Sequence, residues 1–436
     1  MPNPYLPAWE YIPDGEPRVF GDRIYIYGSH DRPGSDSFCD HCLKVWSAPV
    51  DRPSDWTCHG VSFSTRDTDG HPADVDWTDR ALFAPDVVEK DGKYYLYAYI
   101  VDRKGCVAVS DRPEGPFTLL SQYVYRIENQ YDNGTFIDPG VLVDDDGRVY
   151  LYCGYLRSYM AELDPKRMYE VLDGTYREDI LPAEEPFCFF EACSPRKCGD
   201  LYYLIYSPKR GSCLDYATSE SPCGPFTYRG TIIDNGIDYP AGNNHGSICR
   251  IGNQWYVFYH RMTNGTITSR RGCVERIEIL PDGTIPQVEM TSLGFEEALN
   301  PYRPTPADTA CYLTGGCFIT EHNPFVRVIT QITDGCVMGW KYFDFGCGSD
   351  SRMTLLLRVR GCGCRGTLHV CLDRPDGPEI AAVPFGADDA LLRAGLAPVE
   401  GRHALYLRAE TDYSGWLGEP LRGRCLLELS EFLFQR

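Results

Sequence analysis

The amino-acid sequence predicts an all-β protein, a five-bladed β-propeller followed by a β-sandwich domain. Three observations carry this prediction: the composition, five repeats of a turn followed by an aromatic strand, and a proline-rich break near residue 300. Thirty Tyr, 42 Gly and 32 Pro in 436 residues favour strands and tight turns over long helices. Because this length exceeds one typical domain, a large and a small domain are expected.

Five segments share a turn glycine followed by an aromatic-rich strand. They read GDRIYIYGS, DGKYYLYAY, DGRVYLYCG, GDLYYLIYS and GNQWYVFYH, with turn glycines Gly21, Gly92, Gly147, Gly199 and Gly252. The intervals of 71, 55, 52 and 53 residues each suit one four-stranded unit. Repeats of this period predict a propeller, whose blades surround a central channel.

A second strand-like segment precedes each turn and should form a hairpin with the aromatic strand. These segments begin with polar residues, namely Asp14, Asp86, Asp138, Glu191 and His245. If each segment is the innermost strand of its blade, all five side chains start at the same end of the channel. An Asp before a strand is often only a turn residue, but recurrence in five repeats favours a shared functional site.

Carboxylates gathered in a channel suit glycoside hydrolysis. That reaction needs a proton for the leaving oxygen and an activated water on the opposite face of the sugar, which two separated carboxyl groups supply. A third carboxylate can raise the pKa of the acid by like-charge repulsion. The sequence has no GxSxG, GxxxxGK[ST] or HExxH motif and no convincing GxGxxG after a strand.

The net charge indicates the class of partner, and the N-terminal residues and the cysteines bear on the cellular compartment. A formal net charge of −20 disfavours nucleic acid and anionic membranes, so a neutral oligosaccharide or small glycoside is the expected partner. The N-terminal residues lack a secretory signal pattern, which predicts a cytoplasmic protein. The 20 cysteines should then be mostly free, buried thiols. The run Cys39-Asp40-His41-Cys42 has metal-like spacing, but no second matching pair of ligands accompanies it.

The repeat segments resemble glycoside hydrolase family 43 over roughly residues 3–295, notably LFAPDVVEKDGKYYLYAY, FIDPGVLVDDDGRVYLYCG and FFEACSPRKCGDLYYLIYS. The resemblance implies a five-bladed propeller that acts by inversion on arabinosides, xylosides and sometimes galactosides. It also implies that Asp14 is the general base, Glu191 the general acid and Asp138 the residue that raises the pKa of the acid. Asp14 is followed by Gly15-Glu16-Pro17 rather than directly by Pro, so Glu16 remains the alternative base.

The same resemblance implies roles around these carboxylates. Asp86 and Arg270 would help to position the sugar, with Arg271 as the alternative arginine. His245 would sit deep in the channel, where a calcium ion or another cation could bind without taking part in bond cleavage. No cofactor is required.

Several further side chains are expected near the channel mouth. The rings of Trp9, Phe83 and Phe136 could stack on a sugar, although core packing is the more common role of such rings. His30 and Asp31, which end the first repeat, could reach sugar hydroxyls.

The composition changes at NPYRPTPADT, residues 300–309, which predicts a propeller over residues 1–299 and a β-sandwich over residues 310–436. The run MGWKYFDFG and the pattern after it resemble carbohydrate-binding module family 6, a jelly-roll sandwich. That resemblance makes Trp340, Tyr342 and Trp416 candidates for sugar binding. In a cytoplasmic enzyme of short oligosaccharides, a structural role against the propeller is favoured.

The sequence therefore predicts an inverting α-L-arabinofuranosidase or β-D-xylosidase of short pentose-containing glycosides. The alternatives are a catalytically inactive propeller that binds carbohydrate, a galactosidase of the same family, and a retaining fructosidase-type propeller. The retaining alternative is disfavoured because its usual W-x-N-D-P-N-G segment is missing.

Overall fold

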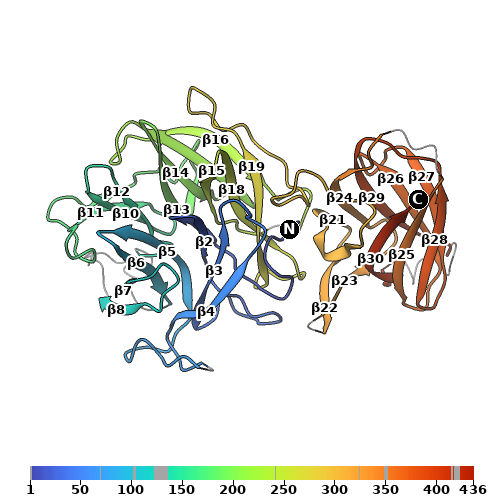
Figure 1. Ribbon diagram of the computed structural model, residues 1–436, viewed down its shortest axis with the longest axis horizontal. Helices are drawn as coiled ribbons and strands as arrows, with labels where there is room; N and C mark the ends of the chain where they lie inside the picture. The colour runs from blue at the N-terminus through green and yellow to red at the C-terminus, as the bar shows by residue number, and fades with distance from the viewer. Residues whose placement is uncertain are drawn as a thin grey trace.

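The computed structural model describes residues 2–68, 70–101, 105–121, 136–240, 242–323, 325–347, 352–413, 416 and 423–436. Figure 1 shows two bodies, a propeller formed by the N-terminal part of the chain and a sandwich formed by the C-terminal part. The predicted all-β fold, a five-bladed propeller followed by a β-sandwich, is confirmed.

The propeller consists of five antiparallel sheets whose strands follow one another in chain order. The first two sheets contain β1 Glu16–Phe20, β2 Arg23–Tyr27, β3 Cys42–Pro49 and β4 Thr57–Ser64, then β5 Leu82–Lys90, β6 Lys93–Ile100, β7 Gly105–Ser110 and β8 Thr118–Ser121. The next two contain β9 Gly140–Val143, β10 Val149–Cys153, β11 Tyr159–Leu163 and β12 Arg177–Glu178, then β13 Phe189–Cys198, β14 Leu201–Pro208, β15 Cys213–Ser219 and β16 Thr227–Asp234. The fifth contains β17 Ser247–Ile251, β18 Gln254–Met262 and β19 Arg270–Ile277.

The first strand of each blade lies innermost, next to the central channel. Strand β1 contacts β5 and β17, and β9 contacts β5 and β13, so the first strands surround the axis. The predicted aromatic strands are the second strands β2, β6, β10, β14 and β18. Each turn glycine before them has a positive φ, between 60° and 83°, which suits a residue without a Cβ.

The N-terminal segment closes the ring against the three-stranded fifth blade. The backbone N–H of Tyr5 donates to the carbonyl of Gly272 on β19 at 3.2 Å. The fully buried amide of Asn3 donates from Nδ2 to the carbonyls of Val274 and Thr291 and to Glu275 Oε1, and its Oδ1 accepts the N–H of Val274. The first residues of the chain are thereby tied to its fifth blade.

The second domain consists of two facing sheets. One has the strand order β22-β23-β30-β25-β28, with β20 also paired to β30, and the other has the order β21-β24-β29-β26-β27. The strands are β20 Thr305–Pro306, β21 Tyr312–Thr314, β22 Phe318–Asn323, β23 Val326–Ile332, β24 Val337–Asp344, β25 Met353–Gly361, β26 Gly366–Leu372, β27 Glu379–Phe385, β28 Ala390–Leu396, β29 Arg402–Thr411 and β30 Leu427–Gln435, and the one-turn 3-10 helix η1 covers Ala307–Thr309. Because β20 pairs with β30, the chain joins this sheet before residue 310.

The two domains share one continuous hydrophobic core. It runs from Tyr203, Leu214 and Val257 of the fourth and fifth blades to Trp340 and Phe432 of the sandwich. Polar contacts cross the same junction, where the N–H of Leu299 donates to the carbonyl of Tyr342 and Ile319 donates to the loop after β18. The sandwich is therefore packed on the propeller.

The aromatic residues expected to bind sugar on the sandwich do not share one environment. Trp340 is fully buried and packs against Phe432 with ring centroids 4.8 Å apart, so an exposed sugar platform at this position is wrong. Tyr342 stacks under Arg402 and donates its hydroxyl to Glu289. Trp416 is 82% exposed.

Two general expectations can be compared with the structure. All cysteines are free thiols and most are buried, as the sequence predicts. Among the described residues, no helix has the length and hydropathy required to cross a membrane.

Candidate active site

Four of the five polar residues predicted to converge in the channel line one pocket. Asp14 precedes β1, Asp138 precedes β9, His245 precedes β17, and Glu191 lies in β13. The pocket encloses about 190 Å³ and is lined by Asp14, Phe38, Phe83, Tyr99, Ile137, Asp138, Tyr155, Glu191, Asn243, His245 and Arg270. It therefore combines three carboxyl groups, one arginine and several aromatic rings.

Asp14 is held from three sides. Its φ of 55° is left-handed, a conformation that Asp tolerates better than most residues. Its Oδ1 accepts a hydrogen bond from Arg270 Nη1 at 2.8 Å, and its Oδ2 accepts one from the Ser29 hydroxyl at 2.6 Å. The Asp14 N–H donates to His260 Nδ1 at 3.3 Å. Burial raises the pKa of Asp14, but the charge of Arg270 and the contacts with His260 and His245 outweigh it and hold that pKa well below its usual range.

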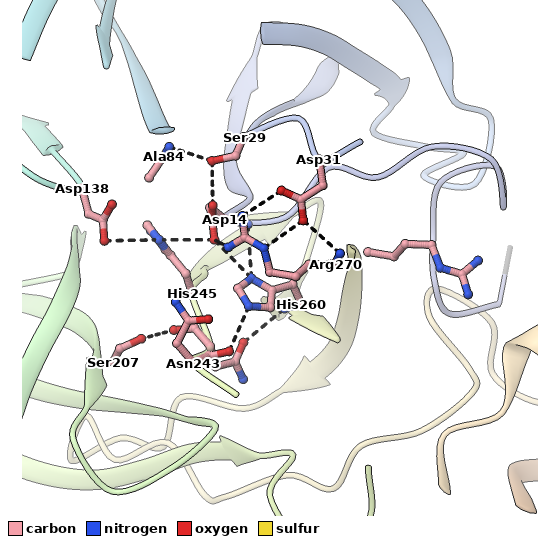
Figure 2. Close-up of polar contacts among 12 residues, drawn as sticks. Asp14, Ser29, Asp31, Ala84, Asp138, Ser207, Asn243, His245, His260 and Arg270 are labelled. Atoms are coloured by element: carbon pink, nitrogen blue, oxygen red, sulfur yellow. Dashed lines mark hydrogen bonds and ion pairs between the residues drawn. The ribbon is translucent and has the colours of Figure 1, made fainter. Parts of the chain in front are cut away.

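Arg270 is fixed by a second carboxylate. Its Nε and Nη2 both donate to Asp31 at 2.9 Å, and its backbone N–H donates to the same side chain. The guanidinium also lies 5.0 Å from the centroid of the Phe38 ring. Figure 2 shows Arg270 between Asp31 and Asp14. Asp31, expected to reach sugar hydroxyls, is instead fully buried beneath the arginine that holds Asp14.

Asp138 and Glu191 form the protonated side of the pocket. Burial, then the charges of Glu191 and Asp14, raise the pKa of Asp138. Burial and the charge of Asp14 raise the pKa of Glu191 to about 7 although Asn243 Nδ2 donates to its Oε1 at 2.9 Å. Since two neighbouring buried carboxyls resist ionising together, this pair retains a proton near neutral pH.

An irregularity in β13 places Glu191. The pairing of β13 with β14 shifts register on both sides of Glu191, and the next residue, Ala192, has a φ of 68°. A bulge of this kind re-aims the side chains next to it. The strand thus turns the Glu191 carboxyl into the pocket, where Asn243 from the fifth blade meets it.

His245 lies between the two sides. Its Nδ1 is 3.7 Å from Asp14 Oδ1 and 3.8 Å from Asp138 Oδ2. Figure 2 shows His245 beside these two carboxyl groups. Burial lowers the pKa of His245 to about 4, so the ring is neutral at pH 7. A neutral ring separates the ionised carboxylate from the protonated pair without adding charge.

The expected cation beside His245 has no protein cage. Calcium takes six to eight oxygen ligands, whereas Asp14 and Asp138 are the carboxylates in contact with His245. Among the described residues, the only close group of three metal-ligating side chains is His30, Asp40 and Cys42. A calcium ion beside His245 would need water for most of its ligands, so this cation stays a prediction and no catalytic step is assigned to it.

Asp86 and Glu16 lie in the channel but outside the pocket lining. Asp86 is fully buried and accepts two hydrogen bonds from Arg18, at 3.0 and 2.6 Å, and one from the N–H of Val141. Glu16 accepts hydrogen bonds from Arg196 at 2.6 Å and Ser194 at 3.0 Å. Asp86 and Glu16 are thus bound by arginines that join blades. Because Asp14 lines the pocket and Glu16 does not, Asp14 is the better placed candidate for the general base.

The remaining predicted contact residues divide between the pocket and its surroundings. Phe83 lines the pocket and packs edge-on against Tyr99, with ring centroids 6.0 Å apart. Trp9 is 50% exposed beside Trp46, and Phe136 is buried in the core between blades. Neither belongs to the described lining of the pocket.

His30 and Arg271 also lie outside that lining. His30 contacts Glu10, Asp40 and Cys42 on the connection between β2 and β3. Arg271 donates to Thr263 and pairs with Asp308 at 3.5 Å, at the junction of the two domains. Arg270, and not Arg271, therefore lines the pocket as the predicted arginine.

Three side chains at the pocket, Ser29, Asn243 and Tyr155, are not among the residues that the sequence predicts there. Ser29 donates to Asp14 and accepts the N–H of Ala84, which links the first two blades at the base. Asn243 lies two residues before His245 in GNNHGS, and that spacing was the available signal for it. Tyr155 follows an aromatic repeat, but no repeated feature marks it.

A comparison with protein-family models finds the description Glycosyl hydrolases family 43 over residues 20–285. The chain belongs to family 43, and it is a glycoside hydrolase. A xylosidase/arabinosidase from Thermoclostridium stercorarium is 38% identical over 93% of this chain and 95% of its own length.

Solved structures of family 43 enzymes resemble this chain as well. A β-xylosidase/α-arabinofuranosidase from a compost microbial metagenome, solved with xylotriose, is 29% identical, covers 66% of this chain and 99% of its own, and has a TM-score of 0.56. A Bacillus subtilis arabinoxylan arabinofuranohydrolase covers 100% of this chain and 97% of its own at 22% identity and a TM-score of 0.57. The second likeness concerns the fold alone, and it extends over the whole chain.

Proposed function

We propose that the protein is an inverting exo-glycosidase that releases a terminal pentose, α-L-arabinofuranose or β-D-xylose, from short glycosides. The observation that carries the proposal is the division of one small pocket into an ionised carboxylate, Asp14, and a protonated pair, Asp138 and Glu191. Inversion requires one carboxyl group in each of these states on opposite faces of the sugar.

Asp14 is the proposed general base. Arg270 and Ser29 fix its two oxygens, so one orientation toward a water is kept. The low pKa limits its basicity, but the water loses its proton only as positive charge develops at the anomeric carbon. An ionised and fixed carboxylate is what that step requires.

Glu191 is the proposed general acid and Asp138 its modulator. Asp138 lies next to Glu191 without entering the reaction, and its repulsion keeps a proton available to the leaving oxygen. The N–H of Ala192 only partly offsets the rise in the pKa of Asp138, so the pair shares a proton, and Glu191 is proposed to pass that proton to the leaving oxygen. After transfer, Glu191 is the carboxylate and Asp14 holds the proton taken from water.

The pocket volume and the relatives support the substrate class. A space of about 190 Å³ holds roughly six waters, which suits one terminal sugar ring better than several. The relatives' names include xylosidase/arabinosidase and β-xylosidase. A β-D-galactofuranosidase from Aspergillus niger, 28% identical over 67% of this chain, keeps a galactoside among the substrates to test.

The sandwich is proposed to stabilise the propeller rather than to bind polymer. Its shared core with the fourth and fifth blades and the burial of Trp340 support this role.

The test is hydrolysis of p-nitrophenyl α-L-arabinofuranoside, β-D-xyloside and β-D-galactoside, with the anomer of the released sugar followed by NMR. Wild type should release an inverted pentose, and Asp14→Ala and Glu191→Ala should each lose about 10²-fold or more. Glu89→Gln, an exposed change on the strand that holds Asp86, is the matched control and should retain activity. A retained anomer would refute inversion, and no turnover of these glycosides or of natural oligosaccharides would favour the inactive, sugar-binding propeller.

A further inference from the structure

Three potential metal ligands from both ends of the β2–β3 connection meet outside the catalytic pocket. His30 follows β2, Asp40 lies two residues before β3, and Cys42 is the first residue of β3. His30 Nδ1 is 3.4 Å from Asp40 Oδ2 and 3.7 Å from Cys42 Sγ, and the three ligand atoms all lie within 4.8 Å of one another. We refer to His30, Asp40 and Cys42 as the loop cluster.

The spacing in the loop cluster is that of ligands sharing an ion. A tetrahedral zinc ion, with bonds of about 2.0–2.1 Å to nitrogen, 2.0–2.2 Å to oxygen and 2.3 Å to sulfur, separates nitrogen from oxygen by about 3.4 Å and nitrogen from sulfur by about 3.6 Å. A direct hydrogen bond between an imidazolium and a carboxylate would bring the atoms to about 2.7–2.9 Å. The observed 3.4 and 3.7 Å agree with the shared ion.

Neighbouring groups orient two of the three ligands, His30 and Asp40. The second ring nitrogen of His30, Nε2, lies 3.2 Å from Glu10 Oε1, and Glu10 is itself held by Trp46 Nε1 at 3.0 Å. The other oxygen of Asp40, Oδ1, accepts the N–H of His41 at 2.8 Å. A carboxylate on the far nitrogen of a histidine is the usual support of a metal-ligating imidazole.

We propose that the loop cluster binds one zinc ion through His30 Nδ1, Asp40 Oδ2 and Cys42 Sγ, with water as the fourth ligand. A set of one nitrogen, one sulfur and one oxygen suits zinc and related borderline ions, whereas calcium and magnesium prefer oxygen alone. Asp40 and His30 are 19% and 13% exposed, which gives the ion a path from solvent.

The position of the loop cluster connects it to the catalytic base. In the sequence, His30 is flanked by Ser29, which donates to Asp14, and by Asp31, which accepts hydrogen bonds from Arg270. A zinc ion would join this segment to Asp40 and Cys42 and so restrict its motion. The cluster thus acts as a stabilising clip behind the pocket and takes no part in bond cleavage.

The competing explanation is an ordinary ion pair in which His30 carries a proton between Glu10 and Asp40. The two explanations differ in metal binding. A zinc site would bind added metal, whereas an ion pair needs no metal.

The test uses the full chain, stripped with a chelator and kept reduced, and titrated with Co²⁺ as a spectroscopic substitute and with Zn²⁺ by equilibrium dialysis. We expect one ion per chain, a thiolate-to-Co²⁺ charge-transfer band, and a higher unfolding temperature with zinc. Cys42→Ser should abolish the band and weaken binding at least about 100-fold, and Glu10→Gln should weaken it by about 10- to 100-fold. Cys58→Ser, an exposed thiol on β4, and His41→Gln are matched controls and should bind like wild type.

Asp40→Asn provides a second probe at the exposed edge of the cluster if Cys42→Ser fails to fold, and it should weaken binding while keeping the fold. Equal affinity in Cys42→Ser, Asp40→Asn and wild type would assign the ion to other thiols and overturn the proposal. The absence of any saturable binding by wild type would overturn it as well, in favour of the ion pair.

Discussion

At the scale of single residues, one ionised carboxylate and one pair of carboxyl groups that keeps a proton line the same small pocket. Arg270 draws Asp14 into an ion pair, and Asp31 neutralises the rest of that guanidinium. Among the described residues, no arginine forms an ion pair with Asp138 or Glu191, which stay under mutual repulsion. The position of one arginine therefore decides which carboxyl group is a base and which pair keeps a proton.

The first prediction concerns pH. Glu191 must be protonated to act, and its pKa is raised to about 7, so kcat/KM should fall about tenfold per pH unit above pH 7. The pKa of Asp14 is lowered, so no acidic limb from this base is expected in the mildly acidic range. Asp138→Asn removes a like charge and should move the alkaline limb to lower pH. A limb that stays in place in this variant would contradict the role of Asp138.

The second prediction separates the acid from the base by the leaving group. Dinitrophenolate leaves without a proton, so Glu191→Ala should lose no more than about tenfold on a 2,4-dinitrophenyl glycoside but about 10²-fold or more on a disaccharide. Asp14→Ala should lose activity on both, because water must be activated in either case. Steady-state kinetics on the two substrates give the comparison. Equal losses in Glu191→Ala would reject it as the proton donor.

The third prediction concerns Tyr155, which lines the pocket and packs edge-on against Phe190, with ring centroids 5.1 Å apart. Tyr155 is 41% exposed and lies beside Phe190, the residue before the proposed acid Glu191, so we expect its ring to contact the leaving sugar. Tyr155→Ala should lower kcat/KM about tenfold for a disaccharide and leave that for a glycosyl fluoride unchanged, because fluoride has no sugar to stack. Leu120→Ala, equally exposed on β8, is the control. An equal loss on both substrates would place Tyr155 against the other sugar.

At the scale of elements, the sequence predicts the features that each repeat contains within itself. Aromatic strands and turn glycines recur with every blade, so Asp14, Asp138 and Glu191 could be placed at one end of the channel. Interactions between blades could not be read in this way. The sequence groups Asp86 with Asp138 at the start of the hairpin segments, yet Asp86 lies within β5 and Arg18, from another blade, engages it.

Contacts within loops are also difficult to predict from the sequence, because the repeats do not determine them. The β2–β3 connection folds back on itself, so His30 meets Asp40 and Cys42, while Cys39 contacts Arg270. The run Cys39-Asp40-His41-Cys42 has metal-like spacing in the sequence, but the ring nitrogen beside Asp40 and Cys42 belongs to His30, ten residues before Asp40. Contacts set by loop conformation carry no periodic signal.

The fourth prediction concerns the segment that closes the propeller. Asn3→Ala removes three donated contacts and one accepted bond. It takes these partners from the buried N–H and carbonyl of Val274, whereas the Thr291 carbonyl keeps its bond from Arg261. The free energy of unfolding should fall by about 2–4 kcal/mol, as measured by urea denaturation. Asn253→Ala, at an exposed turn of the same blade, should change it by no more than about 0.5 kcal/mol. Equal stability of the two variants would show that the N-terminal segment does not hold the ring.

At the scale of the whole molecule, the shared core makes the sandwich part of the propeller's stability. Residues from the fourth and fifth blades pack in one cluster with both sheets of the sandwich, and Arg271, next to Arg270, pairs with Asp308 across the junction. Loss of the sandwich would expose apolar side chains beside the blade that carries Arg270 and His245. The two domains should therefore unfold together.

The fifth prediction tests this coupling through Trp340, which lies fully buried in the sandwich. Trp340→Ala should destabilise the chain by about 3–5 kcal/mol through loss of buried area and the cavity left behind. Calorimetry should show one transition, shifted to lower temperature, and glycosidase activity should disappear at that same lower temperature. If the domains were independent, activity would persist to the wild-type temperature after an earlier sandwich transition. That outcome would make the sandwich a separate module and remove the reason to regard it as a support for the active site.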